Sequence, residues 1–136
     1  MNRKDVHSPP TKDGSADFRV LIVEDEFLVA SEIEEAFIAG GLNVVGVAAT
    51  ADEAIGLAKI HRPCLAIMDI RLAGKRDGID AALQLFRDHG LQCIFATAHV
   101  DEEARRRAAP AMPLAWVQKP YSTSSLLELV KQIRDT

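Results

Sequence analysis

Five short apolar runs, separated by longer segments with helical periodicity, constrain the fold of this chain more than any other feature of its sequence. The runs cover residues 18–23, 42–48, 64–68, 91–96 and 114–117. Nearly unbroken apolar runs of this length are typical of strands that are buried on both faces of a parallel sheet. The alternation therefore predicts an α/β domain in which helices cover both faces of a parallel sheet.

The other segments carry the signals of five helices. They cover about 26–39, 50–61, 77–89, 101–108 and 122–134. Thr50 and Glu53 have the spacing of a capping box, and Asp77 is a suitable N-cap for the third helix. In the first helix, we expect the apolar residues spaced three to four positions apart to face the core, namely Phe27, Ala30, Ile33 and Phe37.

Five strand-helix units joined by right-handed crossovers predict a flavodoxin-like (βα)5 fold, a doubly wound parallel sheet with strand order 2-1-3-4-5. In such a sheet, ligands bind at the carboxyl ends of strands one and three, where the strand order reverses. Glu24 and Asp25 follow the first apolar run, and Asp69 follows the third. We therefore expect these three carboxylates to meet at one edge of the sheet.

Three converging carboxylates repel one another unless a cation offsets their charge. Ligation by oxygen alone suits a hard ion, and a site with few carboxylates favours Mg²⁺ over Ca²⁺. Thr97, after the fourth run, and Lys119, after the fifth, are expected at the same edge. A hydroxyl, an ammonium and a divalent cation can balance the oxygens of a phosphoryl group, and a carboxylate would then be the nucleophile.

With these residues in these positions, the chain resembles the receiver domains of two-component response regulators over residues 18–136. The resemblance implies that Asp69 is the phospho-acceptor. It also implies that Glu24 and Asp25 are the acidic pair that binds Mg²⁺, together with Asp69 and the backbone carbonyl of Arg71. A lone acidic pair is common in soluble proteins, whereas a set of such markers at the ends of the correct strands is a specific pattern.

The same resemblance assigns roles to residues of the fourth and fifth strands. Thr97 is similar to the switch hydroxyl, and Lys119 followed by Pro120 is similar to the lysine-proline signature, whose peptide bond is usually cis in the family. Trp116 occupies the place of the switch aromatic, which turns inward in the family when the hydroxyl is drawn to the phosphoryl group. Packing of the indole between the last two helices is the alternative interpretation of Trp116.

The sequence departs from the commonest receiver pattern in the loop after the acceptor. A Met-Pro pair is absent there, and the loop 71–76 is one residue longer than is common. The segments 95–97 (Phe-Ala-Thr) and 119–121 (Lys-Pro-Tyr) resemble a receiver subgroup with a Phe-Ala-Thr signature, which usually has Gly where this chain has Ala98. The resemblance therefore constrains the acceptor more closely than it constrains the loop.

The function that the resemblance implies is a stand-alone receiver, because the chain ends at Thr136, just after the last expected helix. A sensor histidine kinase or a histidine phosphotransfer protein would phosphorylate Asp69, and the domain would shift between two surface states. A downstream protein, or a second copy in a homodimer, would bind the face formed by 101–108, 114–117 and 122–134. The protein would not be a classical enzyme, although it would catalyse its own phosphoryl transfer and slow dephosphorylation. A piece of a longer regulator is also compatible with the sequence.

Two other functions are compatible with the fold. One is a pseudo-receiver that is never phosphorylated, and the intact Asp69, Thr97 and Lys119 argue against it. The other is a Mg²⁺-dependent phosphohydrolase that uses Asp69 as its nucleophile, and Arg71 stands where the leaving-group acid of such an enzyme would be. We also expect the side chains of Arg71 and His99 to border the phosphoryl pocket and to tune the rate of dephosphorylation.

Charge and composition argue against several other classes of protein. The net charge is −4, so no overall positive field would attract nucleic acid or an anionic membrane. The longest apolar runs fall short of the roughly 20 residues that a membrane-spanning helix needs. Residues 1–17 are polar and contain Pro9 and Pro10, which predicts a flexible tail rather than a secretory signal and favours a cytoplasmic location. Cys64 and Cys93 are interpreted as packing residues rather than metal ligands.

Arg105, Arg106 and Arg107 form a basic run on the short fourth helix. One interpretation is a solvated face that complements the dipole at the end of the helix. The other is a docking surface for an acidic partner or for a second copy of the chain.

Overall fold

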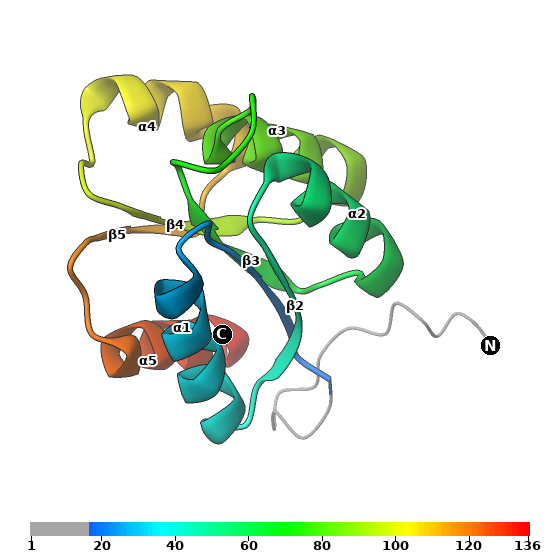
Figure 1. Ribbon diagram of the computed structural model, residues 1–136, viewed down its shortest axis with the longest axis vertical. Helices are drawn as coiled ribbons and strands as arrows, with labels where there is room; N and C mark the ends of the chain where they lie inside the picture. Colours follow the sequence, from blue (N-terminus) through cyan, green and yellow to red (C-terminus); the bar gives the residue numbers. More distant parts are fainter. Residues whose placement is uncertain (1–16) are drawn as a thin grey trace.

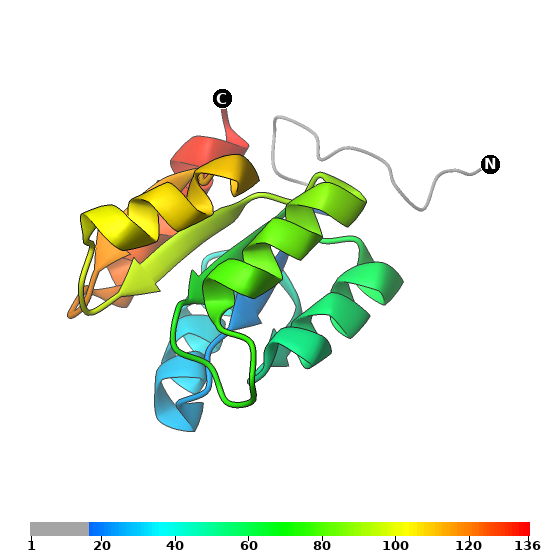
Figure 2. The ribbon, with the colours of Figure 1, turned by 90° about the horizontal axis from the view of Figure 1, so that it is seen from above.

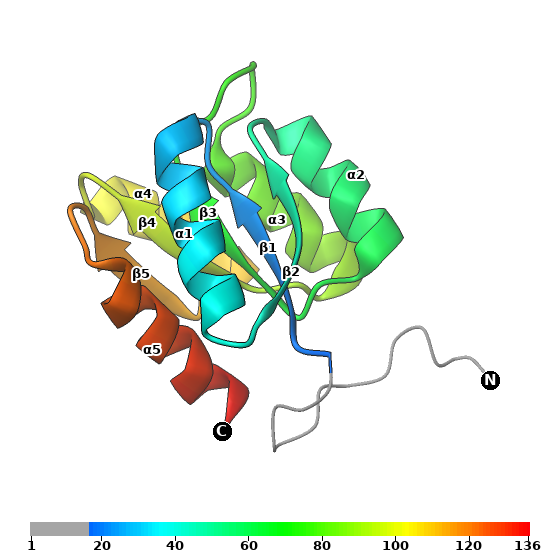
Figure 3. The same cartoon turned by 60° about the horizontal axis from the view of Figure 1, so that its bottom comes forward.

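The computed structural model describes residues 17–136, which contain one five-stranded parallel sheet. The strands are β1 (Arg19–Val23), β2 (Asn43–Ala48), β3 (Leu65–Asp69), β4 (Cys93–Thr97) and β5 (Ala115–Gln118). Their order is β2-β1-β3-β4-β5, and Figure 3 shows them side by side. The predicted flavodoxin-like (βα)5 fold is confirmed. Of the tail predicted at 1–17, residues 1–16 lie outside the described part of the chain.

Helices cover both faces of the sheet (Figure 1). α1 (Phe27–Ala39) and α5 (Thr123–Arg134) lie against one face, and α2 (Ala51–His61), α3 (Gly78–His89) and α4 (Glu102–Ala108) lie against the other. The second group forms a row above the sheet, with α3 between α2 and α4 (Figure 2). Within residues 17–136, no helix is long and apolar enough to cross a lipid bilayer.

Alternate side chains of each strand form two apolar cores, one on each side of the sheet. In β1, Leu21 and Val23 pack with residues of α2 and α3, whereas Val20 and Ile22 pack with residues of α1 and α5. The strands β3 and β4 are buried throughout, while the edge strands β2 and β5 are partly exposed. Burial of one large apolar side chain stabilises a fold by about 1.5–3 kcal/mol, so the central strands hold their carboxyl ends in fixed positions.

Side-chain caps begin several helices where the sequence predicts them. At the start of α2, Thr50 Oγ1 accepts a hydrogen bond from the backbone N–H of Glu53 at 3.1 Å. The Glu53 carboxylate, however, accepts from the N–H of Ala49 at 2.8 Å rather than from that of Thr50, so the predicted capping box is incomplete. At the start of α3 the box is complete, because Asp77 and Asp80 each accept from the backbone N–H of the other.

The predicted end of the fourth helix before Pro110 is confirmed, because α4 ends at Ala108. A 3-10 turn that was not predicted, η2 (Ala109–Ala111), follows α4 directly. Proline is tolerated in the first turn of a helix, where its missing N–H would have no partner within the helix. Met112 has a φ of 50° and ends the turn before the chain enters β5.

One residue that was predicted to face the core is exposed. Phe27 is 79% exposed, whereas Ala30, Ile33 and Phe37 are buried as predicted. Phe27 is the first residue of α1, at the end of the helix that follows the carboxyl end of β1. The prediction for Phe27 was therefore wrong, because helical spacing does not reveal where the sheet ends.

The two cysteines are both free. Cys93 is buried at the start of β4, and burial raises the pKa of its thiol to about 12. Cys64 is half-buried just before β3, and its Sγ accepts a hydrogen bond from the backbone N–H of Arg19 at 3.4 Å. Cys93 belongs to the core on the side of α2 and α3, and Cys64 packs against the core on the other side of the sheet, as the packing interpretation predicts.

Candidate functional site

Three carboxylates meet at the carboxyl ends of β1 and β3, which are neighbouring strands. Glu24 and Asp25 directly follow β1, and Asp69 is the last residue of β3. One oxygen from each side chain lies within 4.8 Å of the other two. Glu24 and Asp69 are only 4% and 6% exposed, whereas Asp25 is exposed. The parallel register of β1 and β3 explains why these carboxylates are close together. Val23 pairs with Met68, so the residues that follow these two lie side by side.

Lys119 reaches the same edge from the loop after β5. Its Nζ lies 3.2 Å from Glu24 Oε1 and 3.4 Å from Asp69 Oδ2. The backbone N–H of Lys119 donates to the carbonyl oxygen of Thr97 at 2.8 Å, which holds the start of this loop beside β4. The peptide bond between Lys119 and Pro120 is cis, as the resemblance implied. One ammonium therefore offsets part of the charge of two buried carboxylates.

Ionisation of both Glu24 and Asp69 is unfavourable unless more positive charge is present. Burial raises the pKa of Asp69 above its ordinary value, despite the nearby ammonium. Burial also raises the pKa of Glu24, and the charge of Asp69 adds to this rise. For Lys119, burial favours the neutral amine, but the two carboxylates outweigh burial and raise its pKa. A bound cation would reduce the cost of ionising both carboxyls.

A cleft of about 730 Å³ opens beside these residues and extends to α4. Thr97 lines it at the end of β4 and is 8% exposed. Its Oγ1 donates a hydrogen bond to the carbonyl oxygen of His99 at 3.3 Å, so the hydroxyl is bound within its own loop. The other predicted site residues that line the cleft are Asp25, Asp69, Arg71, His99 and Lys119.

Comparison with known proteins identifies the family. A family profile described as the response regulator receiver domain matches residues 20–131. The chain belongs to this family. The matched segment runs from β1 into α5 and therefore contains every site residue described above.

Two curated proteins are similar to this receiver domain. The transcriptional regulatory protein PdtaR of Mycobacterium tuberculosis is 36% identical over 124 residues, which cover 90% of this chain and 60% of PdtaR. The phyllosphere-induced regulator PhyR of Methylorubrum extorquens is 35% identical over 115 residues, which cover 83% of this chain and 42% of PhyR. The chain therefore spans 60% of one relative and 42% of the other.

Solved structures also resemble this receiver domain. One is the signal receiver domain of a modulated diguanylate cyclase from Desulfovibrio desulfuricans G20, with a TM-score of 0.78 and 32% sequence identity. The superposition covers 86% of this chain and 93% of that one. The likeness extends over nearly all of the described fold.

The oxygen ligands of this receiver domain fit Mg²⁺. The three carboxylates supply hard oxygen donors within one small volume. Asp25 is exposed, so a cation held there could keep water ligands, as Mg²⁺ prefers. The backbone N–H of Arg71 donates to Asp69 Oδ1 at 3.3 Å, which holds the loop after β3 close to the carboxylate. The role of the Arg71 carbonyl as a ligand stays a prediction.

Trp116 is not among the residues that line the cleft. Its ring stacks on Phe95 of β4, with centroids 4.7 Å apart. The guanidinium of Arg105 in α4 also lies over the Trp116 ring, 5.3 Å from its centroid. The indole therefore packs between β4 and a side chain of α4, rather than between α4 and α5. The role of Trp116 as a switch stays a prediction.

The other two arginines of the basic run have acidic partners. Arg106 pairs with Glu103 within α4. Arg107 crosses to α3 and pairs with Asp77 and Asp80. The contact of Arg107 could not be foreseen from the sequence, because charge patterning gives no signal of contact between residues 27 and 30 positions apart. The run is therefore more than a solvated face.

Proposed function

We propose that this receiver domain accepts a phosphoryl group onto Asp69 from a phosphorylated histidine of a sensor kinase or a phosphotransfer protein. The observation that supports this most strongly is the position of Lys119, whose ammonium contacts both Asp69 and Glu24 beside an open cleft. Buried charges cost free energy in a folded protein. Their accumulation at a cleft therefore favours a chemical role over a structural one.

In the proposed reaction, a carboxylate oxygen of Asp69 attacks the phosphorus atom of the donor. As the O–P bond forms, the N–P bond of the phosphohistidine breaks, and its electron pair stays on the imidazole nitrogen of the donor. The ammonium of Lys119, 3.4 Å from Asp69 Oδ2, can offset negative charge on the transferred oxygens. The N–H of Arg71 binds Asp69 Oδ1 and so fixes the orientation of the carboxylate.

Mg²⁺ is the proposed cofactor. When bound, it would supply the positive charge that the carboxylates and a phosphoryl group together require. Glu24, Asp25 and Asp69 are the side chains proposed to hold it, with the backbone carbonyl of Arg71 as a further ligand. Glu24 Oε2 accepts a hydrogen bond from the N–H of Glu26 at 3.0 Å, so this carboxylate is already oriented by the backbone.

We further propose that phosphorylation changes the surface through Thr97. Its hydroxyl now donates to the neutral carbonyl of His99, and a charged phosphoryl oxygen is a stronger acceptor that would draw it away. Release of the His99 carbonyl would free the loop that leads into α4. We therefore expect a downstream protein to bind the face formed by α4, β5 and α5. We also expect Trp116, which lies in β5, to change its packing on phosphorylation.

Incubation with acetyl phosphate and Mg²⁺, followed by measurement of the intact mass, tests the proposed acceptor. The wild-type protein should gain the mass of one phosphoryl group, and Asp69→Asn should gain none. Asp101→Asn is the matched control, because Asp101 lines the same cleft and asparagine can still cap α4. This variant should be phosphorylated like the wild type, and EDTA should prevent the mass gain in both.

Two outcomes would contradict the proposal. A wild-type protein that gains no mass with acetyl phosphate or with a phosphorylated histidine donor would be a pseudo-receiver. A protein that rapidly hydrolyses many free phosphate esters, at a rate that Asp69→Asn abolishes, would be a phosphohydrolase instead.

A further inference from the structure

Arg107 connects α4 to the start of α3 through two carboxylates. Its Nη1 donates to Asp77 Oδ2 at 3.0 Å, and its Nη2 donates to Asp77 Oδ1 at 3.3 Å and to Asp80 Oδ1 at 3.2 Å. The same two carboxylates form the capping box of α3. A planar guanidinium binds both oxygens of one carboxylate in a fixed geometry while a further N–H reaches a second carboxylate, and the compact ammonium of a lysine lacks this fixed planar geometry. The contact is therefore specific to arginine at this position.

The segment that Arg107 holds lies directly on the backbone of Asp69. Gly78, which follows Asp77, donates its N–H to the carbonyl oxygen of Ile70 at 2.7 Å. A Cβ atom at Gly78 would lie only 1.9 Å from the carbonyl oxygen of Asp69. Because no space separates the start of α3 from the end of β3, a displacement of one is transmitted to the other.

Few apolar contacts fix the position of α4. The helix has seven residues, and only Ala108 among them is buried. Arg105 lies over the face of Trp116 in β5, and Arg107 reaches α3, which lies next to α4 in Figure 2. Two arginine side chains therefore tie α4 to its neighbours on both sides, one by a cation–π contact and the other by ion pairs.

We propose that Arg107 is a positioning residue that couples the start of α3, and with it Asp69, to the position of α4. One continuous path runs from the guanidinium through Asp77 and Gly78 to the backbone carbonyl of Asp69. A change at Asp69 that displaces the start of α3 loosens α4 along this path. A partner that moves α4 in turn changes the cleft around Asp69, because coupling between two sites is reciprocal.

Only the effect of Asp69 phosphorylation on α4 rests on the proposed function. The link between α3 and α4 is a property of the unphosphorylated chain, in which Arg107 and Asp69 line the same cleft. It can therefore be tested with and without a phosphoryl group on the protein.

Amide hydrogen exchange of the metal-free, unphosphorylated chain tests the link by itself. Arg107→Gln removes the contact with α3, and Arg106→Gln is the matched control, because it removes the same charge from a side chain that pairs within α4. We expect Arg107→Gln to accelerate exchange roughly fivefold in both α4 and residues 70–80. Arg106→Gln should leave residues 70–80 unchanged, and Arg107→Lys should restore exchange only in part. If residues 70–80 exchange in Arg107→Gln at the same rate as in the wild type, the proposal is overturned.

Fluorescence of Trp116 provides the second readout, because it is the single tryptophan of the chain and contacts α4 through Arg105. Once a mass gain is recorded, phosphorylation should change the emission of the wild type. Unphosphorylated Arg107→Gln should already show part of that change, whereas Arg106→Gln should show none. If unphosphorylated Arg107→Gln shows the same Trp116 emission as the unphosphorylated wild type, the coupling between α3 and α4 is contradicted. If the wild type gains no mass, the proposed function fails, and the exchange experiment still decides the role of Arg107.

Discussion

The ammonium of Lys119 lies between Glu24 and Asp69, 3.2 Å from an oxygen of the first and 3.4 Å from an oxygen of the second. Lys119 belongs to the loop after β5, whereas the two carboxylates lie at the ends of β1 and β3. To reach them, the lysine side chain passes the end of β4, which separates β3 from β5 in the sheet. The charge balance of the site therefore depends on one side chain that joins the ends of three strands.

Replacement of Lys119 by glutamine should lower the free energy of unfolding of the metal-free protein by about 1–3 kcal/mol. The variant leaves the two buried carboxylates without their neighbouring positive charge. Chemical denaturation in the presence of EDTA measures the difference. Lys59→Gln on the exposed surface of α2 is the control and should change stability by less than about 0.5 kcal/mol. Equal stability of the two variants would contradict this description of the site.

Removal of the Asp69 charge should stabilise the metal-free protein at neutral pH. Burial raises the pKa of Asp69 from its ordinary value of 3.8, so the folded protein holds this proton more tightly than the unfolded chain. Ionisation of Asp69 above pH 3.8 therefore costs stability in the wild type, and Asp69→Asn does not carry this contribution. We therefore expect the variant to be the more stable of the two proteins at neutral pH.

Denaturation of both proteins across the acidic range checks the cause of this difference. The advantage of Asp69→Asn should disappear as the pH falls below 3.8, because Asp69 is then protonated in the folded and the unfolded wild type. An advantage that stays constant with pH would show that ionisation of Asp69 is not its source. Asp25→Asn at the exposed member of the group should give a smaller difference.

Replacement of Gly78 by alanine should be strongly destabilising. The added Cβ would lie 1.9 Å from the carbonyl oxygen of Asp69 and 2.8 Å from its carbonyl carbon, and backbone atoms cannot give way as a flexible side chain can. We expect a loss of more than about 3 kcal/mol in the free energy of unfolding. Gly56→Ala in α2, where an added Cβ meets no atom within 4 Å, should instead raise stability by about 0.5–1 kcal/mol. A Gly78→Ala variant as stable as the wild type would contradict the close contact between α3 and β3.

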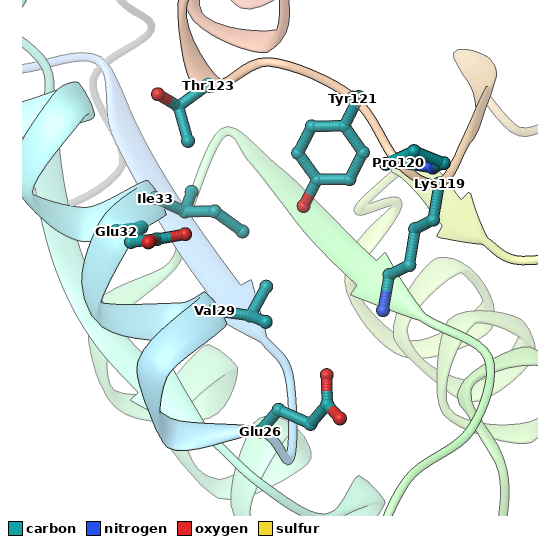
Figure 4. Close-up of a pocket in the computed structure, with 8 residues that line it drawn as sticks. All are labelled: Glu26, Val29, Glu32, Ile33, Lys119, Pro120, Tyr121 and Thr123. Carbon is teal, nitrogen blue, oxygen red and sulfur yellow. The ribbon is translucent and has the colours of Figure 1, made fainter.

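Tyr121 carries a buried hydroxyl that has no hydrogen-bond partner within residues 17–136. Its hydroxyl end points toward α1, which carries Val29 and Ile33, at a pocket of about 220 Å³ that Lys119 also lines (Figure 4). Burial raises the pKa of this hydroxyl. Because an unsatisfied buried hydroxyl costs about 1–3 kcal/mol, Tyr121→Phe should raise the free energy of unfolding by roughly 1 kcal/mol. A decrease measured by denaturation would show that the hydroxyl is hydrogen-bonded in solution.

The positions of the main site residues could be predicted because the topology of a parallel sheet determines them. Asp69 and Thr97 each stand at the end of an apolar run, and the carboxyl ends of parallel strands meet at one edge. Lys119 could be placed there for the same reason. Its contact with Glu24 could not be predicted, because the sequence does not determine how far each side chain extends along that edge.

Residues on helices were harder to predict. Phe27 has the helical spacing of a core residue but is exposed, because periodicity identifies the face of a helix and not the point where the helix passes the sheet. Asp77 was predicted as a cap of α3, and this is confirmed, but its second contact with Arg107 was not foreseen. That contact depends on the relative position of α3 and α4, which only the packing of both helices on the sheet determines.

Borohydride reduction followed by peptide mass spectrometry tests the central claim, phosphorylation of Asp69, most directly. Borohydride reduces an acyl phosphate to an alcohol, so a phosphorylated aspartate becomes homoserine, whereas a free carboxylate does not react. After incubation with acetyl phosphate and Mg²⁺, we predict homoserine at position 69 and at no other aspartate. Homoserine at another position, or its absence from protein whose mass had increased, would contradict the assignment of Asp69 as the acceptor.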